Sequence, residues 1–259
     1  MGTVSKALSL LDFFSRSQPE IGLSELTRAS GLNKATVYRL LSDLQIHGFV
    51  EQTGARAYRL GPAVLRLAAI REATVPMRQI VQATLDRLSD TTGETSHLAQ
   101  IQGDRLVTLA YAYSPAHGTA VRMEDAAVTP FHATATGLAV LAFAGPAFCD
   151  RRLAQPLPAF TPDTPTDPAD IRARLGRIRA SGYSESVGGF EADVHSLAVP
   201  LFDATACIGA VAVATPKSRM TPALRARIIA ALFDAAHDIV ALWGGFLPDE
   251  LQRLWVDAV

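Results

Sequence analysis

The 259-residue sequence contains only two cysteines, Cys149 and Cys207, and they lie 58 positions apart. Neither has a second cysteine or a histidine at the spacing of a zinc site, so we expect two reduced structural thiols. The six histidines are scattered and form no His-x-x-x-His pair. The sequence therefore predicts no metal site and no cofactor.

Long hydrophobic runs are also missing. The longest apolar stretches, Gly137 to Pro146 and Ile208 to Ala214, are shorter than the roughly 18–20 residues that cross a bilayer. The N-terminus lacks the basic segment, the apolar segment and the cleavage site of a signal peptide. We therefore expect no membrane span and a cytoplasmic protein.

Motifs of common catalytic sites are absent as well. The sequence has no Gly-x-Ser-x-Gly elbow, no phosphate-binding Gly-x-x-x-x-Gly-Lys loop and no dinucleotide-binding glycine pattern. His132, two residues after Pro130, is compatible with a base or a ligand, but a histidine that fixes the turn before a helix is the commoner case. The sequence therefore predicts no enzymatic activity.

What the sequence does contain is enough apolar material for a core. Hydrophobic residues make up 49% of the chain, charged residues 19%, and mean hydropathy is +0.18. Residues 1–72 carry nine basic and six acidic residues, a net charge of +3, whereas the rest carries 15 basic and 19 acidic residues, a net charge of −4. A basic small domain joined to an acidic larger one indicates a polyanionic partner for the first.

Apolar periodicity predicts three helices near the N-terminus. The first helix has one apolar face, formed by Val4, Leu8, Leu11 and Phe14, and is expected to end near residues 15–18. A second, short helix covers Ser24–Ser30, with an N-cap near Ser24 and an end at Gly31. Asn33 is expected to cap a third helix, which buries Val37, Leu40, Leu41 and Leu44.

These elements follow the pattern of a helix-turn-helix, which consists of a short helix, a glycine turn and a second helix whose first turns are polar and basic. Strands at Gly48–Gln52 and Ala57–Leu60, around a basic tip, predict a wing. The alternative is a plain three-helix unit with an ordinary hairpin, in which positive residues need not gather at the helix start and the tip. We predict that eight residues contact DNA: Ser24, Asn33, Lys34, Ala35, Thr36, Tyr38, Arg39 and Arg56.

The remainder of the chain reads as an α+β domain. A linker helix ends near Arg71, and Pro76 suits the first turn of a new helix that ends at Thr92. Further helices are expected at 134–143, 168–181 and 221–243, and strands at 95–102, 105–113, 183–187, 195–202 and 207–215. Leu153 to Asp170 reads as an exposed connection with little chemistry. The predicted domains are 1–60 for DNA binding, 61–74 for the linker and 75–259 for effector binding and oligomerisation.

One face of the predicted sheet carries only small side chains. Ala210, Ala212 and Ala214 alternate along one strand, and Ser196 and Ala198 alternate along another. This pattern leaves space for a ligand above the sheet, although a closely packed helix is an equally simple explanation.

The chain resembles the isocitrate lyase regulator (IclR) family of transcription factors. The resemblance extends over nearly the full length and is carried by Val4–Leu8, Gly22–Leu26, Gly31–Leu41, Tyr58–Gly61, Gly93–Thr95, Pro130–Gly137 and Ile178–Tyr183. It implies an N-terminal winged helix-turn-helix domain and a C-terminal GAF-like antiparallel sheet with flanking helices. It also implies a homodimer or tetramer that binds double-stranded DNA and a small-molecule effector.

In this family, effectors lie over the sheet against the helix that here begins near Thr134. The main-chain amides of Ala135, Thr136 and Gly137 are expected to be free there, and free amides suit a carboxylate. Relatives that hold very small oxo-acids carry hydroxyls at the positions of Ala212 and Ala214, and Ser186 stands where an acidic residue is common. These departures favour a larger, less polar effector, an aromatic or hydrophobic carboxylate. A small oxo-acid such as glyoxylate or pyruvate is the alternative. The resemblance places the effector site at Met123, Phe131, Thr134, Ala135, Thr136, Gly137, Val194, Ser196, Ala212 and Ala214.

The sequence therefore predicts a transcriptional regulator whose operator affinity depends on an effector. Because a helix-turn-helix dimer reads two half-sites about one turn apart, the operator is expected to be palindromic. Two alternatives remain. An enzyme fused to a DNA-binding module would turn the ligand over, and an architectural DNA-binding protein without an effector would have a collapsed pocket.

Overall fold

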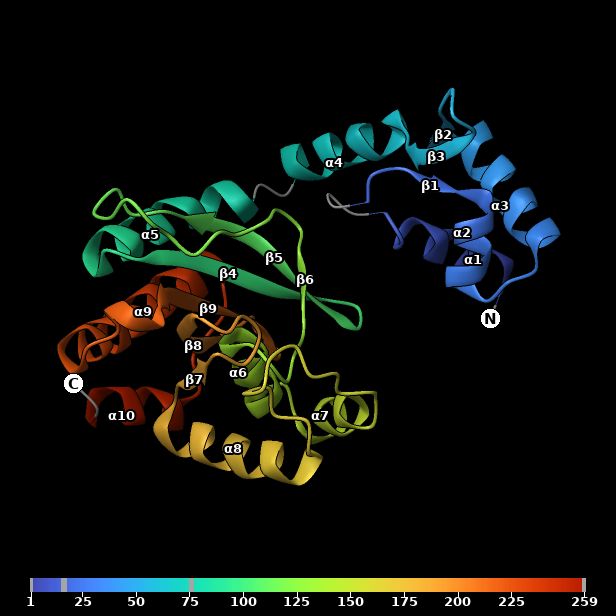
Figure 1. Ribbon diagram of the computed structural model, residues 1–259. Coiled ribbons are helices and arrows are strands. Elements are labelled where there is room, and N and C mark those ends of the chain that lie inside the picture. Colours follow the sequence, from blue (N-terminus) through green and yellow to red (C-terminus); the bar gives the residue numbers. More distant parts are fainter. Residues whose placement is uncertain (1, 15–17, 75–76, 258–259) are drawn as a thin grey trace. The chain divides into compact units, whose positions relative to one another are not determined.

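The computed structural model describes residues 2–14, 18–74 and 77–257. The chain divides into two compact units, residues 1–76 and residues 77–259 (Figure 1). Within the described ranges, no helix has both the length and the apolar character needed to cross a bilayer.

The N-terminal unit packs three helices against a small antiparallel sheet of strand order β1-β3-β2. Its elements are α1 (Thr3–Leu11), β1 (Ile21–Gly22), α2 (Leu23–Ser30), α3 (Lys34–Ile46), β2 (Val50–Gln52) and β3 (Ala57–Leu60). The predicted inner face of α3 is confirmed, because Val37, Leu40, Leu41 and Leu44 are buried. They pack in one core with Leu10 of α1, Leu26 of α2 and Tyr58 of β3.

Two details of this unit differ from the sequence prediction. The first helix is shorter than expected, since α1 ends at Leu11 and Phe14 lies beyond it. The expected N-cap near Ser24 is also wrong: α2 begins at Leu23, and Gly22 occupies the N-cap position without a side-chain hydrogen bond. Gly31 does end α2 as predicted, with a left-handed φ of 67° that residues with a side chain rarely adopt.

The long helix α4 (Pro62–Thr74) follows the sheet and spans the predicted linker. It exposes apolar side chains at Leu65, Leu67 and Ile70. The predicted role of Pro76 at the start of the next helix lies outside the described residues.

The C-terminal unit is built on a six-stranded antiparallel sheet of order β6-β5-β4-β9-β8-β7. Its strands are β4 (Thr95–Gln102), β5 (Arg105–Ala112), β6 (Val128–Thr129), β7 (Ser184–Val187), β8 (Val194–Phe202) and β9 (Cys207–Pro216). The predicted strands lie within one residue of the observed bounds, whereas the two-residue strand β6 was not predicted. The predicted α+β class with an antiparallel sheet and flanking helices is confirmed.

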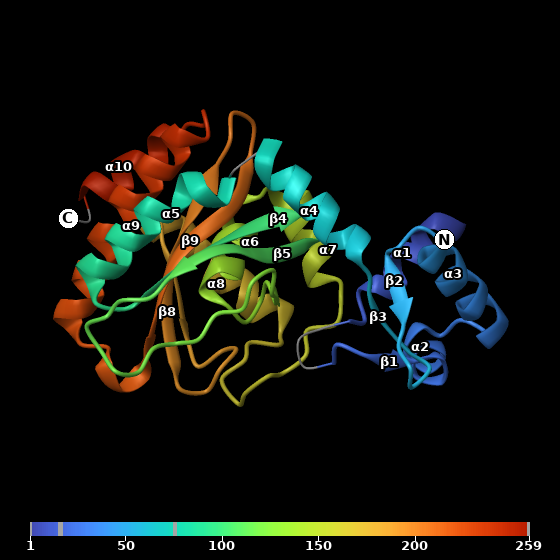
Figure 2. The same ribbon diagram turned by 90° about the horizontal axis from the view of Figure 1, so that it is seen from above.

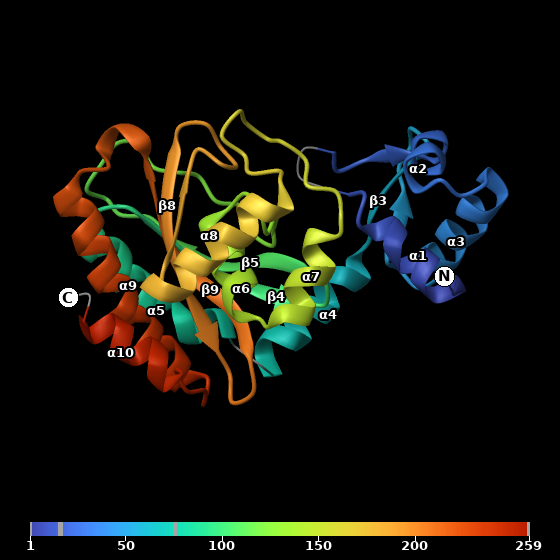
Figure 3. The ribbon, with the colours of Figure 1, turned by 90° about the horizontal axis from the view of Figure 1, so that it is seen from below.

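Helices cover both faces of this sheet (Figures 2 and 3). One face packs against α5 (Met77–Thr92) and α9 (Pro222–Leu242), and the other packs against α6 (Ala135–Phe143). The helix α8 (Pro168–Ser181) lies against α6. Two short helices that the sequence analysis missed complete the unit, α7 (Pro146–Leu153) and α10 (Asp249–Asp257).

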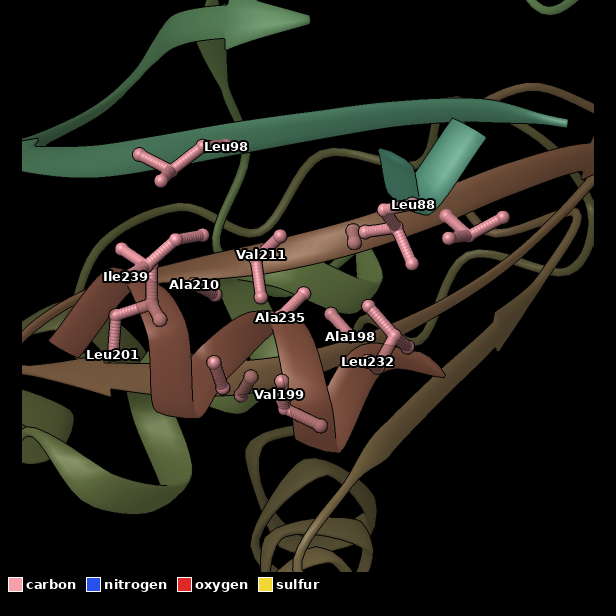
Figure 4. Close-up of a cluster of buried hydrophobic side chains, with 14 of the residues drawn as sticks. Leu88, Leu98, Ala198, Val199, Leu201, Ala210, Val211, Leu232, Ala235 and Ile239 are labelled. Atoms are coloured by element: carbon pink, nitrogen blue, oxygen red, sulfur yellow. The ribbon is translucent and has the colours of Figure 1, made fainter. Parts of the chain in front are cut away.

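The α9 face of the sheet packs into an apolar core. Leu232, Ala235 and Ile239 of α9 lie over Val199 and Val211 in the sheet (Figure 4). Full burial stabilises a leucine, isoleucine or valine side chain by about 1.5–3 kcal/mol. Because successive strand residues point to opposite faces, the alanines beside Val211 point to the α6 face instead. The expected row of small side chains therefore lies under α6.

Candidate DNA-binding surface and effector pocket

The first half of α3 presents polar and basic side chains to solvent. Lys34, Ala35 and Arg39 are exposed, and Tyr38 is 56% exposed. Their positions follow from the opposite face of the helix, where the buried residues described above fix α3 against the rest of the unit. Exposed cations on the first turns of a helix, which also carry the positive end of the helix dipole, suit a phosphate backbone.

Asn33 and Thr36 take part in the helix cap. The Thr36 main-chain amide donates a hydrogen bond of 2.8 Å to Asn33 Oδ1. This bond confirms the predicted cap, and it uses the side-chain oxygen of Asn33 internally. Ser24, on α2, is exposed. The structure thus places all the α2 and α3 residues that were predicted to contact DNA on the outside of the unit, except that Thr36 is half-buried.

The hairpin formed by β2 and β3 carries Arg56 at its tip. Arg56 is exposed and has a φ of 59°, a left-handed conformation that costs a residue with a side chain roughly 1–2 kcal/mol. Arg59 in β3 differs, because its Nε lies 2.6 Å from Glu51 Oε1 in an ion pair. Lys34, Arg39 and Arg56 make no ion pair within the described ranges, so their charges are free to meet a polyanion.

A cavity of about 80 Å³ lies in the C-terminal unit beside the start of α6. Seven of the ten predicted effector residues line it: Met123, Thr134, Ala135, Thr136, Val194, Ser196 and Ala214. They come from the loop before β6, from the start of α6 and from β8 and β9. The structure therefore brings together residues that are as far as 91 positions apart in the sequence.

The other three predicted residues lie outside this lining. Phe131 packs edge-to-face on Phe148, with ring centroids 5.4 Å apart. A Cβ atom on Gly137 would lie 2.3 Å from Phe131 O, so glycine is needed there for close packing. Ala212 is fully buried on the α6 face of the sheet.

The start of α6 offers two main-chain amides rather than three. Thr134 Oγ1 accepts a hydrogen bond of 3.0 Å from the Gly137 amide, so the expectation that this amide is free is wrong. Within the described residues, the amides of Ala135 and Thr136 have no hydrogen-bond acceptor. Unpaired amides at a helix N-terminus are a suitable site for a carboxylate.

The pocket also contains polar side chains outside the predicted set of site residues. Ser186 of β7 lines it, as do Thr108 of β5, Thr129 of β6 and His97 of β4. The site is thus not as poor in hydroxyls as Ala212 and Ala214 suggested. The sequence contained part of the signal for His97, because alternation along the strand places it on the same face as Thr95 and Ala99. The pairing of His97 with Ala212, however, joins distant segments and was not apparent from the sequence.

His97 carries little positive charge at neutral pH. It is 8% exposed, and burial lowers the pKa of its imidazole to about 4. Its Nδ1 atom is buried without a hydrogen-bond partner, and so is Thr129 Oγ1. Glu191, in the loop after β7, also lines the pocket. The residue as a whole is exposed, but partial desolvation of its carboxyl group raises the pKa of that group.

The segment from Leu153 to Asp170 is exposed over most of its length, as expected of a connection, but Thr164 and Pro165 within it are buried. Thr164 is 9% exposed and its Oγ1 donates a hydrogen bond of 2.6 Å to Gly189 O, in the loop that lines the pocket. His132 Nε2 lies 3.0 Å from Pro158 O of the same segment. This contact agrees with the expected structural role of His132.

Known protein families match both units of the chain. Residues 3–54 match the IclR helix-turn-helix domain, and residues 72–241 match the family described as bacterial transcriptional regulator IclR C-terminal. The HTH-type transcriptional regulator XynR of Escherichia coli strain K12 is 29% identical over 224 residues, which cover 85% of this chain and 88% of XynR.

Two solved structures show the same architecture. An IclR-type transcriptional regulator from Silicibacter sp. TM1040 is 56% identical, with a TM-score of 0.90 and coverage of 96% of this chain and 99% of that one. An IclR homolog from Microbacterium hydrocarbonoxydans, complexed with 4-hydroxybenzoate, is 25% identical, with a TM-score of 0.74 and coverage of 93% and 99%. Members of the family are regulators, which removes the alternative of an enzyme fused to a DNA-binding module. The chain therefore belongs to the IclR family and is a DNA-binding transcriptional regulator with an effector-binding domain.

Proposed function

We propose that the regulator binds its operator through the first half of α3, supported by α2 and the tip of the wing. The contacts are those predicted above, from Ser24 to Arg56. The observation that carries this proposal is the set of exposed cations without ion pairs, Lys34, Arg39 and Arg56. Cations that bind phosphates release counterions, so operator affinity is expected to fall steeply as salt rises.

We also propose that the chain works as a homodimer or a tetramer. Within the N-terminal unit, α1 exposes Val4 and Leu8, which are 72% and 49% exposed, and α4 exposes Leu65, which is 76% exposed. Apolar side chains that remain exposed on two helices of one unit suit a second copy of the chain. Two copies would present two α3 helices to successive major grooves, which favours a palindromic operator.

For the effector, we propose a carboxylic acid held by the amides of Ala135 and Thr136 and by the hydroxyl of Ser196. The cavity volume of about 80 Å³ is smaller than the roughly 150 Å³ of an engineered cavity that binds benzene. As it stands, the pocket suits a small oxo-acid such as glyoxylate or pyruvate. An aromatic acid is the second candidate, favoured by the bound 4-hydroxybenzoate in the Microbacterium homolog, and it requires the cavity to widen.

A single experiment tests the operator proposal and the effector proposal. Operator DNA is first selected from a random duplex library with the purified full-length protein. The complex is then titrated with glyoxylate, pyruvate, benzoate and 4-hydroxybenzoate while fluorescence anisotropy reports DNA binding. We expect a palindromic consensus and a change in affinity with at least one acid. Selection without any consensus contradicts the operator proposal, and a response to none of the acids contradicts the effector proposal.

A further inference from the structure

A hollow of about 290 Å³ lies at the β7 edge of the six-stranded sheet, where α8 and α9 contribute to its walls. We call it the edge hollow. Its polar lining consists of three arginines, two hydroxyl-bearing residues and one carboxylate: Arg174, Arg177, Arg225, Ser181, Tyr183 and Glu185. None of the residues that line the edge hollow lines the effector pocket. The two are therefore separate sites within one unit.

Two of the arginines belong to α8 and have no ionic partner. Arg174 and Arg177 are three positions apart, so they are neighbours on one face of the helix and their like charges repel each other. Within the part of the chain that the structure describes, neither makes an ion pair or a side-chain hydrogen bond, although Arg174 is half-buried. Arg172 on the same helix differs, because its Nη1 lies 2.7 Å from Asp150 Oδ1. Two unpaired cations at one hollow favour an anionic ligand.

The third arginine is held in place by a hydrogen-bond network. Arg225 Nε and Nη2 donate hydrogen bonds of 2.9 and 2.6 Å to the Glu185 carboxylate, and Nη2 also donates one of 3.1 Å to the Tyr183 hydroxyl oxygen. The hydrogen bond with His195 and the bonds from Arg225 lower the pKa of Glu185 to about 2, so this carboxylate stays ionised. Three guanidinium groups and one carboxylate give the hollow a net charge of +2. The rest of its unit is acidic.

This charge and the available space select the kind of anion. A phosphate monoester carries a charge of about −1.5 to −2 at pH 7, whereas a carboxylate carries only one charge, and the guanidinium fork suits phosphate oxygens. The volume of about 290 Å³ exceeds the roughly 150 Å³ of a cavity that binds benzene, so it holds more than a bare phosphate. A neighbouring hollow of about 680 Å³ shares Tyr183 and Arg225 with it and has a mainly apolar lining that includes Met220, Pro222 and Ile229.

We propose that the edge hollow binds a small phosphorylated organic molecule, with its phosphate on Arg174, Arg177 and Arg225 and its organic part in the neighbouring apolar hollow. This second ligand site does not depend on the effector proposal. The strand β7 contributes to both sites, because Ser186 lines the effector pocket and the adjacent Glu185 lines the edge hollow. Ligands at the two sites therefore contact successive residues of one strand.

The test compares two probes that share a phenyl ring and differ in charge. Isothermal titration calorimetry at about pH 8 uses phenyl phosphate, which is a dianion above its second pKa of about 6, and benzenesulfonate, which carries one charge. We expect the full-length protein to bind phenyl phosphate at least roughly tenfold more tightly than benzenesulfonate. Inorganic phosphate should also bind more weakly than phenyl phosphate, because it has no organic part. Equal affinity for any two of these probes overturns the proposal, as does a failure of phenyl phosphate to bind.

Variants of equal net charge locate the binding site. The double variant Arg174→Gln with Arg177→Gln should weaken phenyl phosphate binding by roughly tenfold or more, since it removes charge-assisted hydrogen bonds. The matched control is Arg151→Gln with Arg172→Gln, which removes the same charge from residues that do not line the hollow. An equal loss in both double variants would show a general charge effect and overturn the proposal.

A further variant distinguishes the edge hollow from the effector pocket. Ala214→Phe fills the effector pocket and should leave the affinity for phenyl phosphate unchanged, because Ala214 does not line the edge hollow. Loss of phenyl phosphate binding in Ala214→Phe, with binding retained in the Arg174 and Arg177 double variant, would place the probe in the effector pocket and overturn the assignment.

Discussion

The two units of this regulator leave polar groups unpaired in opposite surroundings. In the N-terminal unit, the cations of α3 and of the wing tip are exposed, and water solvates them at little cost. In the C-terminal unit, His97 Nδ1 and Thr129 Oγ1 are buried without a hydrogen-bond partner among the described residues. Both candidate sites therefore contain unpaired polar groups. In one site these groups are exposed charges, and in the other they are buried neutral groups.

The difference predicts how each site responds to conditions. DNA binding by exposed cations is long-ranged and depends on salt, since it releases counterions from the duplex. Effector binding in a pocket lined mostly by uncharged residues depends on shape and on short hydrogen bonds, so it is expected to depend little on salt. Some charged groups of the C-terminal unit are paired internally. Buried Glu94, for example, accepts hydrogen bonds of 2.8 and 2.6 Å from Arg219.

The largest effect is expected from filling the pocket. Ala214 is 2% exposed and lines the cavity, so Ala214→Phe places a ring in a space of about 80 Å³. The response to every acid should disappear, while operator binding survives because the DNA-binding residues belong to the other unit. The measurement is operator anisotropy with and without acid, and Ala214→Ser is the control. A retained response in Ala214→Phe would move the effector site elsewhere.

The second effect is a pH dependence of stability in the C-terminal unit. Unfolding restores the pKa of His97 from about 4 to its ordinary 6.5. Above pH 6.5 the imidazole is neutral in both states. As pH falls from 6.5 to 4, the unfolded state binds a proton that the folded state refuses, so stability should fall by about 3 kcal/mol.

Both tryptophans, Trp243 and Trp255, belong to the C-terminal unit, so urea unfolding followed by tryptophan fluorescence reports on it alone. His97→Asn, which does not titrate in this range, should flatten the pH dependence between 6.5 and 4. Glu185 provides a separate reference, because its hydrogen bond with His195 and its contacts with Arg225 lower the pKa of its carboxyl group to about 2. Its contribution to stability is lost only as pH falls from its ordinary 4.5 toward 2. An unchanged slope in His97→Asn would show that other groups cause it.

The third effect concerns the exposed cations. Arg39→Ala should weaken operator binding roughly five- to 150-fold, the equivalent of about 1–3 kcal/mol for a base contact. If Arg39 binds a phosphate instead, the magnitude of the salt slope should fall by about one. Arg59→Ala is a control within the same unit, because Arg59 is already paired with Glu51. Equal losses in both variants would indicate a general charge effect and contradict the assignment of α3.

Much of this fold was predictable because local patterns determine it. The helix that buries Val37 and Leu40 and the strand that carries Ala210 and Ala214 were both found from their apolar spacing. The two-residue strands and the short helices α7 and α10 were missed, because so few residues show no clear period. The end of α1 was misplaced for a related reason: Phe14 continues the apolar spacing although the helix has ended at Leu11.

The effector pocket was predictable only in part. Thr134 and Ala135 follow from the resemblance and from a local helix start, whereas His97 enters through its pairing with Ala212 across the sheet. Sequence spacing does not give such long-range register. The size of the cavity is also a result of packing: small side chains at Ala212 and Ala214 suggested space for a large ligand, but α6 fills part of that space.

The smallest effect separates the two roles of Asn33, as a helix cap and as a DNA contact. Asn33→Ala removes the acceptor of the Thr36 amide, which should destabilise α3 by about 1 kcal/mol. Asn33→Asp keeps an acceptor at this position, and its negative charge interacts favourably with the helix dipole. The same charge would lie beside the DNA phosphates and repel them. Hydrogen exchange of the peptide that covers α3 should therefore quicken in Asn33→Ala and not in Asn33→Asp. Operator affinity should fall more in Asn33→Asp than in Asn33→Ala, and the opposite order would place Asn33 away from the DNA.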